Sequence, residues 1–270
     1  MISISFCKFH GFGNDYIVFE ADNLREVSSI EDFARAVCHR NTGIGGDGIA
    51  ILRKLKAEAD YYCEIVNPDG SIAGFSGNGT RCAVAYLYYK SLFSGENFKL
   101  QTKSGIKNYH FLERNKNSFQ FRAELGKPQT ITNYELQIAN YERKFPIIEL
   151  DVGNPVAVIF TADFNATDWR SIGREIENHA HFPDRTNVVF VKVTDSENVE
   201  IRIWERGAGE TSSSGTCSIA AAVASVFTNK TDRKVFVHAE GGTTEAVWRE
   251  DGEMMITGRA ELAFCGEVFI

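Results

Sequence analysis

Hydrophobic residues along the chain follow two patterns, one typical of buried helices and one typical of strands. The segments RCAVAYLYYKSLF (81–93) and CSIAAAVASVF (217–227) are apolar on nearly every side, which predicts two core helices. Other segments alternate in polarity or are rich in β-branched and aromatic residues, which predicts strands at 98–102, 107–113, 118–125, 234–239, 244–250 and 253–258. NKN (115–117) and EDG (250–252) predict hairpin turns. The pattern therefore indicates strands that wrap a central helix.

This arrangement occurs twice along the chain. When Ser76 is aligned with Ser214, further landmarks fall at nearly constant offsets from the two serines. The matched landmarks are 13–19 with 153–159, 65–70 with 203–208, and 100–105 with 237–242. We expect the break between the copies within LGKPQTITNYE (125–135), where a glycine, a proline and polar residues interrupt the pattern. The chain is therefore predicted to contain two copies of one α/β unit.

Composition narrows the class of partner. The chain has 270 residues, 43% of them hydrophobic, and a net charge of −7 with acidic and basic residues interspersed. This balance argues against nucleic acid or a membrane surface as the partner and favours a small molecule. The N-terminal MISISFCKFHGFGND has no continuous apolar core, and no run of 18 apolar residues occurs, so neither export nor a membrane span is indicated. We expect a cytoplasmic protein.

Cysteine and histidine spacing suggests neither a disulfide framework nor a metal site. The six cysteines are scattered without a CxxC pair, so we expect reduced and mostly buried thiols. The histidines show no ligand spacing beyond HAH at 179–181, which is expected to be a solvated loop. Asp47 in GIGGDG is interpreted as a turn or capping residue.

The chemistry of interest lies at the starts of the two predicted core helices. Ser76 and Ser214 each precede a glycine there, which alone is typical of an ordinary N-cap. Two such starts at matched positions, however, present N–H groups and aligned peptide dipoles that can stabilise the charge of a bound carboxylate. The residues whose backbones could approach such an anion are Gly77, Asn78, Gly215 and Thr216.

Six motifs place the chain beside a known family. They are FHGFGNDYIVFE, TGIGGDGIAIL, VNPDGSIAGFSGNGTRC, VGNP, RTNVVFV and ERGAGETSSSGTCS. In this order and spacing the whole chain resembles the diaminopimelate epimerase family. The resemblance implies an α+β fold of two pseudosymmetric domains, each a curled β-sheet or barrel around a central helix, with the active site in the cleft between them. The expected domains are 1–126 and 127–261, with residues 262–270 returning to the first.

The resemblance also implies an activity. Family members are amino-acid epimerases that move an α-proton without a cofactor, on the route to lysine and to a peptidoglycan precursor. We therefore expect no cofactor and no metal. The expected substrate is a small amino-acid-like molecule that carries a carboxylate, and because members are commonly dimeric, a homodimer is the expected assembly.

The chain departs from the family at the reacting positions. The family carries its two catalytic cysteines where this chain has Ser76 and Ser214, and Val156 replaces the histidine that assists the first thiol. Glu205, which matches the residue that assists the second thiol, is retained, and Cys217 is interpreted as a packing residue. A thiol of pKa about 8.5 ionises far more readily than a hydroxyl. We expect Ser76, Ser214 and Glu205 to be the catalytic residues, without two-base epimerisation at the family's rate.

Most ligand-gripping positions of the family are matched. By place within the motifs they are Asn14, Asn67, Asn154, Asn187, Glu205 and Arg206. Arg206 is suited to a bidentate clamp on a carboxylate. An asparagine in a Gly-Asn turn also has a purely conformational interpretation, because its short polar side chain tolerates left-handed backbone geometry.

Two functional classes stay open at this point. One is an epimerase, or a related one-base isomerase or lyase that uses Glu205, which the retained ligand positions favour. The other is a non-catalytic ligand-binding homologue, which the missing thiols and histidine favour. A packing or assembly role without a ligand is a third class, and the retained Arg206 and asparagines argue against it.

Overall fold

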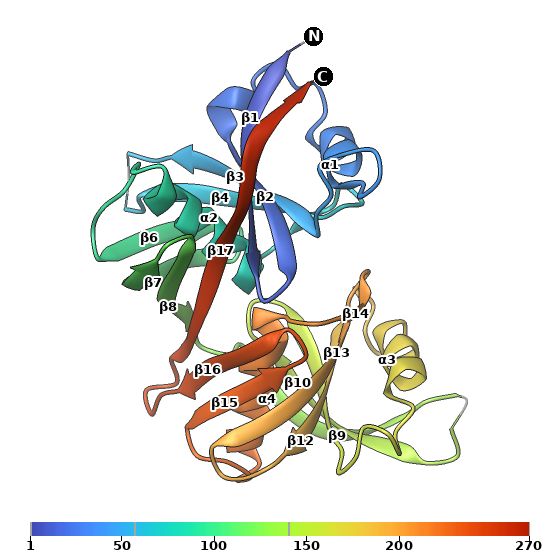
Figure 1. Ribbon diagram of the computed structural model, residues 1–270. Helices are drawn as coiled ribbons and strands as arrows, with labels where there is room; N and C mark the ends of the chain where they lie inside the picture. The colour runs from blue at the N-terminus through green and yellow to red at the C-terminus, as the bar shows by residue number, and fades with distance from the viewer. Residues whose placement is uncertain (1, 57, 140, 270) are drawn as a thin grey trace. The chain divides into compact units, whose positions relative to one another are not determined.

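The structure is a computed structural model that describes residues 2–56, 58–139 and 141–269 (Figure 1). The chain divides into two compact units, residues Met1–Ala123 with Gly258–Ile270 and residues Glu124–Thr257. The limits expected from the sequence, 126/127 and 261/262, fall a few residues from these. The strands β8 (Ser118–Gly126) and β17 (Met254–Phe269) contain the two points where the chain passes from one unit to the other.

The first unit is a ring of strands around one helix. Its remaining elements are β1 (Ser3–Gly11), β2 (Asn14–Glu20), the 3₁₀ helix η1 (Ala21–Leu24), α1 (Ile30–Cys38), β3 (Gly48–Lys54), β4 (Tyr61–Val66), β5 (Ile72–Ala73), α2 (Gly77–Tyr89), β6 (Asn97–Thr102) and β7 (Gly105–Asn115). Strands β1, β2, β3, β4, β6, β7, β8 and β17 are hydrogen-bonded in that order, and β17 pairs back onto β1. A closed ring leaves no free strand edge.

The second unit repeats this order of elements. They are β9 (Ile131–Gln137), β10 (Lys144–Asp151), β11 (Pro155–Phe160), α3 (Trp169–Glu177), β12 (Asn187–Val193), β13 (Asn198–Glu205), β14 (Gly209–Thr211), α4 (Gly215–Phe227), β15 (Lys234–Ala239), β16 (Gly242–Trp248) and the first residues of β17. The parallel pair β2–β3 of the first unit corresponds to the parallel pair β11–β12, and β4–β6 corresponds to β13–β15. The two units therefore share one topology.

The helices occupy equivalent places in the two units. The outer helices α1 and α3 connect the parallel strand pairs, and each has a side-chain cap, from Ser29 and Asp168. The central helices α2 and α4 have 13 residues each and are buried over nearly their whole length, α2 against β1, β2 and β3 and α4 against β11, β12 and β16. A helix surrounded by strands must be apolar on all sides. This confirms the two predicted core helices.

The predicted strands and hairpins are also found. The segments expected to be strands lie in β6, β7, β8, β15, β16 and β17, and the turns at NKN and EDG contain Lys116 and Gly252 with φ of 54° and 88°. The expected interruption at 125–135 is only partly irregular, because β8 continues to Gly126 and β9 begins at Ile131. Pairing of β9 with β10 supplies backbone partners that the sequence pattern does not reveal.

The expectation that all cysteines are reduced is wrong for two of them. Cys7 in β1 and Cys265 in β17 form a disulfide across directly opposed positions of an antiparallel pair. The two residues are 258 positions apart, so their pairing depends on the return of the C-terminal strand to β1 and leaves no local spacing signal. Cys38, Cys63, Cys82 and Cys217 are free and buried, as expected.

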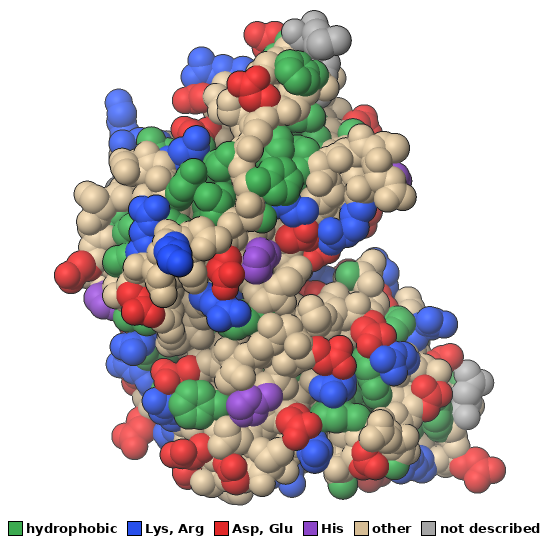
Figure 2. All heavy atoms as spheres, viewed as in Figure 1, with side chains coloured by type: hydrophobic (Ala, Val, Ile, Leu, Met, Phe, Trp, Pro, Cys, Tyr) green, Lys and Arg blue, Asp and Glu red, His purple; other side chains and the backbone are tan. Residues whose placement is uncertain are grey.

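The surface shows interspersed charge. On the face in Figure 2, acidic and basic side chains alternate over both units, and neither kind forms a broad patch. Among the described residues, no helix has the length and apolar character needed to cross a membrane.

Candidate active site

The two serines singled out from the sequence cap the two central helices. Ser76 and Ser214 have extended backbones, and their hydroxyl oxygens accept hydrogen bonds from the backbone N–H groups of Gly79 (3.1 Å) and Cys217 (3.4 Å). Each serine thus satisfies one of the free N–H groups at a helix start. The remaining N–H groups and the helix dipole favour an anion at both places. The capping role and a role in chemistry are compatible.

Ser76 is in contact with a phenol. The hydroxyl of Tyr16, on β2, lies 2.9 Å from Ser76 Oγ. The Tyr16 ring is buried, and it occupies the space next to two glycines: a Cβ at Gly48 or at Gly79 would fall 2.9 Å or 2.8 Å from Tyr16 Cε1. The glycines therefore make room for the ring. The GNDYIVF segment predicts only an apolar run, so the sequence does not reveal the contact between Tyr16 and Ser76.

Ser214 is in contact with a carboxylate instead. Its hydroxyl donates a hydrogen bond to Glu205 Oε1 at 3.2 Å. Glu205 is the last residue of β13, where antiparallel pairing with Gly209 in β14 closes a tight turn. The structure thus brings together Ser214 and Glu205, as the family motif implies. We call each capping serine with its partner a half-site: Ser76 with Tyr16 is the first, and Ser214 with Glu205 is the second.

The turn after Glu205 is held by an acid that the sequence did not single out. Glu177, at the end of α3, is buried and accepts hydrogen bonds from Trp204 Nε1 (2.7 Å) and from the backbone N–H of Gly207 (2.8 Å). It also forms an ion pair with Arg185. Glu177 therefore holds the indole of Trp204, just before Glu205, and the backbone of Gly207, just after it. Its position on the amphipathic outer helix gave no signal for this role.

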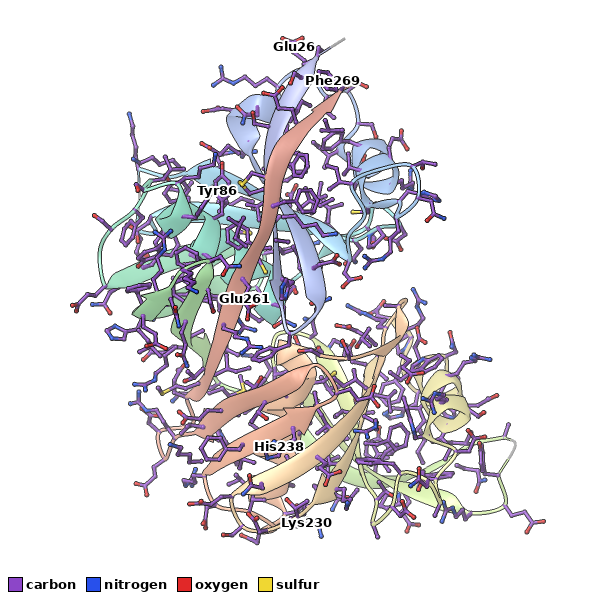
Figure 3. All side chains as sticks on the ribbon, in the orientation of Figure 1. Glu26, Tyr86, Lys230, His238, Glu261 and Phe269 are labelled. Carbon is purple, nitrogen blue, oxygen red and sulfur yellow. A yellow bond between two sulfur atoms is a disulfide. The ribbon has the colours of Figure 1, made fainter. Side chains whose placement is uncertain are left out.

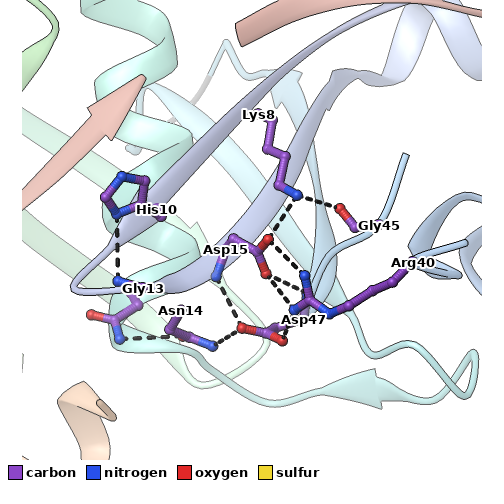
Figure 4. Close-up of polar contacts among 9 residues, drawn as sticks. Lys8, His10, Gly13, Asn14, Asp15, Arg40, Gly45 and Asp47 are labelled. Atoms are coloured by element: carbon purple, nitrogen blue, oxygen red, sulfur yellow. Dashed lines mark hydrogen bonds and ion pairs between the residues drawn. The ribbon is translucent and has the colours of Figure 1, made fainter. Parts of the chain in front are cut away.

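The first unit carries a chain of amide contacts beside the start of α2. Asn14 donates to Asp47 Oδ2 at 2.8 Å (Figure 4), and Asn14 Oδ1 accepts from Asn78 Nδ2 at 3.2 Å. Asn78 Oδ1 in turn accepts from Arg81, a fully buried residue of α2 that also donates to the backbone of Arg259. Asn14 and Asn78, both expected to bind ligand, are thus held in defined orientations.

Asp47 is more than the turn or capping residue that we expected. Its carboxylate accepts from Asn14 and from the backbone N–H of Asp15, and it pairs with Arg40 (Figure 4). Asp15 pairs with both Lys8 and Arg40. Burial and the charge of Asp15 raise the pKa of Asp47. Burial alone would also raise the pKa of Asp15, but hydrogen bonds from Arg40 and Lys8 outweigh it and lower this pKa.

Asn67 lies in a turn after β4. Its backbone N–H donates to the carbonyl of Ser71, and its side-chain amide donates to Ser71 Oγ at 3.0 Å. This contact fits the conformational interpretation of an asparagine in a turn. A part in ligand binding stays a prediction for Asn67.

In the second unit, Asn187 and Arg206 are linked. Asn187 is buried, donates to the carbonyl of Pro155 at 3.1 Å and accepts from the backbone N–H of Arg206 at 3.0 Å. The Arg206 guanidinium donates to the carbonyl of Asp184 at 3.1 Å. Asn154 is half-buried in the turn between β10 and β11. The clamp role of Arg206 and the binding role of Asn154 stay predictions.

The free thiols lie in the core. Cys217 is fully buried, and burial together with the charge of Glu205 raises its pKa. Burial likewise raises the pKa of Cys82 to about 12. A thiol in such surroundings stays protonated and inert, so these cysteines do not replace the family's reactive pair. Val156, which the resemblance places at the position of the family's histidine, is fully buried in β11.

Among the described residues, no group of three or more histidines, cysteines, aspartates or glutamates is arranged so that it could hold a metal ion. In the HAH segment, which is a loop as expected, His179 contacts the carbonyl of Gln137 and His181 contacts Glu149 at 2.9 Å.

Comparison with known proteins supports one family throughout. The diaminopimelate epimerase family model matches residues 6–131 and 149–263. The chain is 35% identical to a diaminopimelate epimerase of Pelotomaculum thermopropionicum, over 97% of this chain and 98% of that protein, and 34% identical to one of Moorella thermoacetica over the same shares.

A solved structure shows the same fold at lower identity. A hydroxyproline epimerase from Agrobacterium vitis superposes with a TM-score of 0.74 at 14% identity, over 99% of this chain and 91% of that one. The two-domain architecture implied by the motifs is therefore confirmed. By the extent of the sequence match, this chain belongs to the diaminopimelate epimerase family.

Proposed function

We propose that the protein is an isomerase that moves the α-proton of diaminopimelate or a closely related amino acid, with no added cofactor. The observation that carries the proposal is the hydrogen bond from Ser214 to Glu205 at the start of α4. It places a proton-accepting carboxylate at the start of a helix, whose first N–H groups favour an anion, so a base and a candidate anion site lie together. The relatives in the family are named for epimerisation of diaminopimelate.

The negative charge that develops on deprotonation is met by the helix starts. Removal of the α-proton puts charge on the substrate carboxylate. The residues that open α2 and α4, Gly77 with Asn78 and Gly215 with Thr216, are buried and carry backbone N–H groups of the first helical turns. Such groups stabilise an oxyanion without reorganisation. We assign the substrate carboxylate to these N–H groups and to Arg206.

The serines set the expected rate. A hydroxyl is a poor base unless a neighbour accepts its proton, and Ser214 has such a neighbour in Glu205. We therefore propose that Glu205 removes the α-proton, directly or through Ser214, and that Ser76 supplies the proton that returns on the opposite face. The second candidate function is isomerisation or elimination without inversion, in which Glu205 acts alone as the base. Its support is the same Glu205 contact together with serine instead of cysteine at both capping positions.

The deciding experiment is α-proton exchange in heavy water. LL- and meso-diaminopimelate and a panel of amino acids are incubated with the protein, and deuterium incorporation and epimer ratio are followed by mass spectrometry and chiral chromatography. We expect incorporation that Glu205→Gln reduces by at least about a hundredfold. Incorporation without a change in epimer ratio would favour the one-base function. Ligand binding without any incorporation would leave the non-catalytic homologue and refute the isomerase.

We also propose that the protein acts as a homodimer in the cytoplasm. Support comes from β17, where Phe264 and Phe269 of the first unit are 46% and 62% exposed, an unusual exposure for large apolar side chains. Figure 3 labels Phe269 at the end of this strand. Sedimentation equilibrium of the parent and of Phe264→Ser tests this assembly. A parent that is monomeric at micromolar concentration would refute it.

A further inference from the structure

Tyr16 is a buried residue whose hydroxyl contacts the capping serine of α2. Its hydroxyl lies 2.9 Å from Ser76 Oγ, and its ring packs beside Gly48 and Gly79. A Cβ at either glycine would fall 2.9 Å or 2.8 Å from Tyr16 Cε1. The ring is therefore closely packed against both glycines. This packing fixes the phenol at hydrogen-bond distance from the helix cap.

We infer that Tyr16 is the positioning residue of the first half-site: its phenol donates a hydrogen bond to Ser76 Oγ and thereby makes Ser76 a proton donor. The inference rests on the proposed function for the identity of the reaction. A phenol, with pKa about 10, is the stronger acid of the two hydroxyl types, so the hydrogen bond runs from Tyr16 to Ser76.

The hydrogen bonds at Ser76 allow this polarity. A serine oxygen has two lone pairs and one hydrogen. The N–H of Gly79 takes one lone pair, and either hydroxyl can donate in the contact between Tyr16 and Ser76. With Tyr16 as the donor, both lone pairs of Ser76 are occupied and its hydrogen is left for another acceptor. At the second helix start the polarity is opposite, because Ser214 gives its hydrogen to Glu205.

The proton balance of this half-site is simple. When a carbanion is protonated, the O–H bond of Ser76 breaks and a C–H bond forms. The O–H bond of Tyr16 breaks in the same step, and its proton restores the Ser76 hydroxyl. The phenolate then takes a proton from water, and the proton held by Glu205 returns to water. The effective acid is thus a phenol, which is closer in pKa to the family's thiol than a lone alcohol is.

A thiol at position 76 tests the contact with Tyr16 without any turnover. In Ser76→Cys, a phenol that donates a hydrogen bond stabilises the thiolate. Removal of the phenol hydroxyl, in Ser76→Cys combined with Tyr16→Phe, should therefore shift the pH midpoint of iodoacetamide alkylation upward. At a pH below both midpoints, the alkylation rate should fall by roughly tenfold, the worth of one hydrogen bond to a charged group. Phenylalanine keeps the ring beside the glycines, and circular dichroism checks the fold.

Two controls isolate the phenol. The charged groups near the helix start, including Asp15, Asp47 and Arg40, are the same in both variants, so the difference between them reports the phenol. Ser214→Cys, whose partner is Glu205, should show the same midpoint with and without Tyr16→Phe. An unchanged or lowered midpoint for the thiol at position 76 would overturn the inference, because it would mean that Tyr16 is no donor.

Turnover separates this inference from the proposed function. In the chain with both serines, Tyr16→Phe should lower kcat for inversion at least about tenfold with little change in KM. Deuterium incorporation into the epimer whose α-proton faces Glu205 should persist. Inversion at the parent's kcat in Tyr16→Phe would overturn the inference. If the parent exchanges no α-proton, the proposed function fails, and the alkylation midpoint still decides the role of Tyr16.

Discussion

The two capping serines hold equivalent places in their units but have different partners. Ser76 is 2.9 Å from the phenol of Tyr16, whereas Ser214 is 3.2 Å from the carboxylate of Glu205. A carboxylate is the better proton acceptor and a phenol the better donor. Equivalent serines in the two units therefore have chemically different partners, a carboxylate for Ser214 and a phenol for Ser76. This difference is the basis of the opposite polarity that we infer for them.

The packing behind the serines differs in a compensating way. Three positions correspond by strand register and by distance from the helix cap. They are Tyr16, Gly48 and Gly79 in the first unit and Val156, Asn187 and Cys217 in the second. One large ring next to two glycines thus corresponds to three side chains of moderate size, all buried. A larger side chain at the first position is thus accompanied by smaller ones at the other two, and a phenol hydroxyl is present in one unit only.

The largest expected effect comes from replacing both capping serines by cysteine. Ser76→Cys combined with Ser214→Cys should raise diaminopimelate epimerisation by about a hundredfold or more, because a thiol can ionise near neutral pH and act in both directions. Chiral chromatography of the epimers measures the rate. The matched control is Ser212→Cys, an exposed serine of the same segment, which should change nothing. An unchanged rate in the double variant would show that the serines are not at the reacting positions.

Adding the family's histidine is a separate step. Val156 is fully buried, and its register partner Asn187 is buried beside it, so Val156→His should cost about 1–3 kcal/mol of stability through overpacking. We expect the triple variant to gain further rate only at temperatures where it stays folded. A melting curve recorded beside each rate separates the two effects.

A smaller effect is expected from the proposed carboxylate clamp in the second unit. Arg206→Ala should weaken diaminopimelate binding by roughly 1.5–3 kcal/mol, the worth of a hydrogen bond to a charged group, measured by calorimetry. Arg206→Lys should recover only part of it, because lysine lacks the planar fork. Arg25→Ala, which breaks an exposed ion pair with Asp22, serves as the control. Equal affinity in parent and Arg206→Ala would remove the clamp from the site.

A stability test examines the exchanged packing directly. Gly79→Ala places a Cβ 2.8 Å from the Tyr16 ring, so we expect a loss of about 1–3 kcal/mol, although alanine favours a helix. At the corresponding position, Cys217→Ala only removes a buried sulfur and should cost about 1 kcal/mol. Calorimetric melting compares the two. Tyr16→Val should restore much of the stability lost in Gly79→Ala, and purely additive losses would contradict the compensation.

The sequence alone predicts those features that depend on local pattern. The two core helices, their serine caps and the repeat follow from apolar runs and from Ser-Gly at matched offsets. Glu205 and Ser214 were placed in one half-site from the family motif. The Tyr16 contact could not be predicted, because its three positions lie in separate segments that meet only through the β2–β3 register and the start of α2.

Other features were missed for the same physical reason. Cys7 and Cys265 come together because β17 returns to β1, and Glu177 reaches the Gly207 turn from an outer helix. In both cases the partner is distant in sequence. Asp47 was taken for a turn residue because GIGGDG looks like a loop, although its carboxylate binds Asn14, Asp15 and Arg40. Long-range polar pairing leaves little trace in the pattern of hydrophobic positions.

The smallest expected effect concerns acid sensitivity, where the two Gly-Asn turns differ by one residue. Asp15 follows Asn14 in the first unit, whereas the uncharged Pro155 follows Asn154 in the second. Hydrogen bonds from Arg40 and Lys8 outweigh burial and lower the pKa of Asp15, so its contribution to stability is full above the unfolded pKa of about 3.9 and is lost as pH falls through the folded value.

Asp47 opposes the loss of stability that Asp15 causes in acid, and the net effect can be measured by comparing the two Gly-Asn turns. Because the pKa of Asp47 is raised in the folded state, its protonation on acidification stabilises the fold. The effects of Asp15 and Asp47 on stability in acid therefore partly cancel. Asp47→Asn removes the opposing group, and the turn at 11–14 should then open more readily below about pH 4. Hydrogen exchange of peptides covering residues 8–20 and 148–160 tests this, with the second as the internal control. Equal acid sensitivity in the two peptides would contradict the assignment of the effect to Asp15.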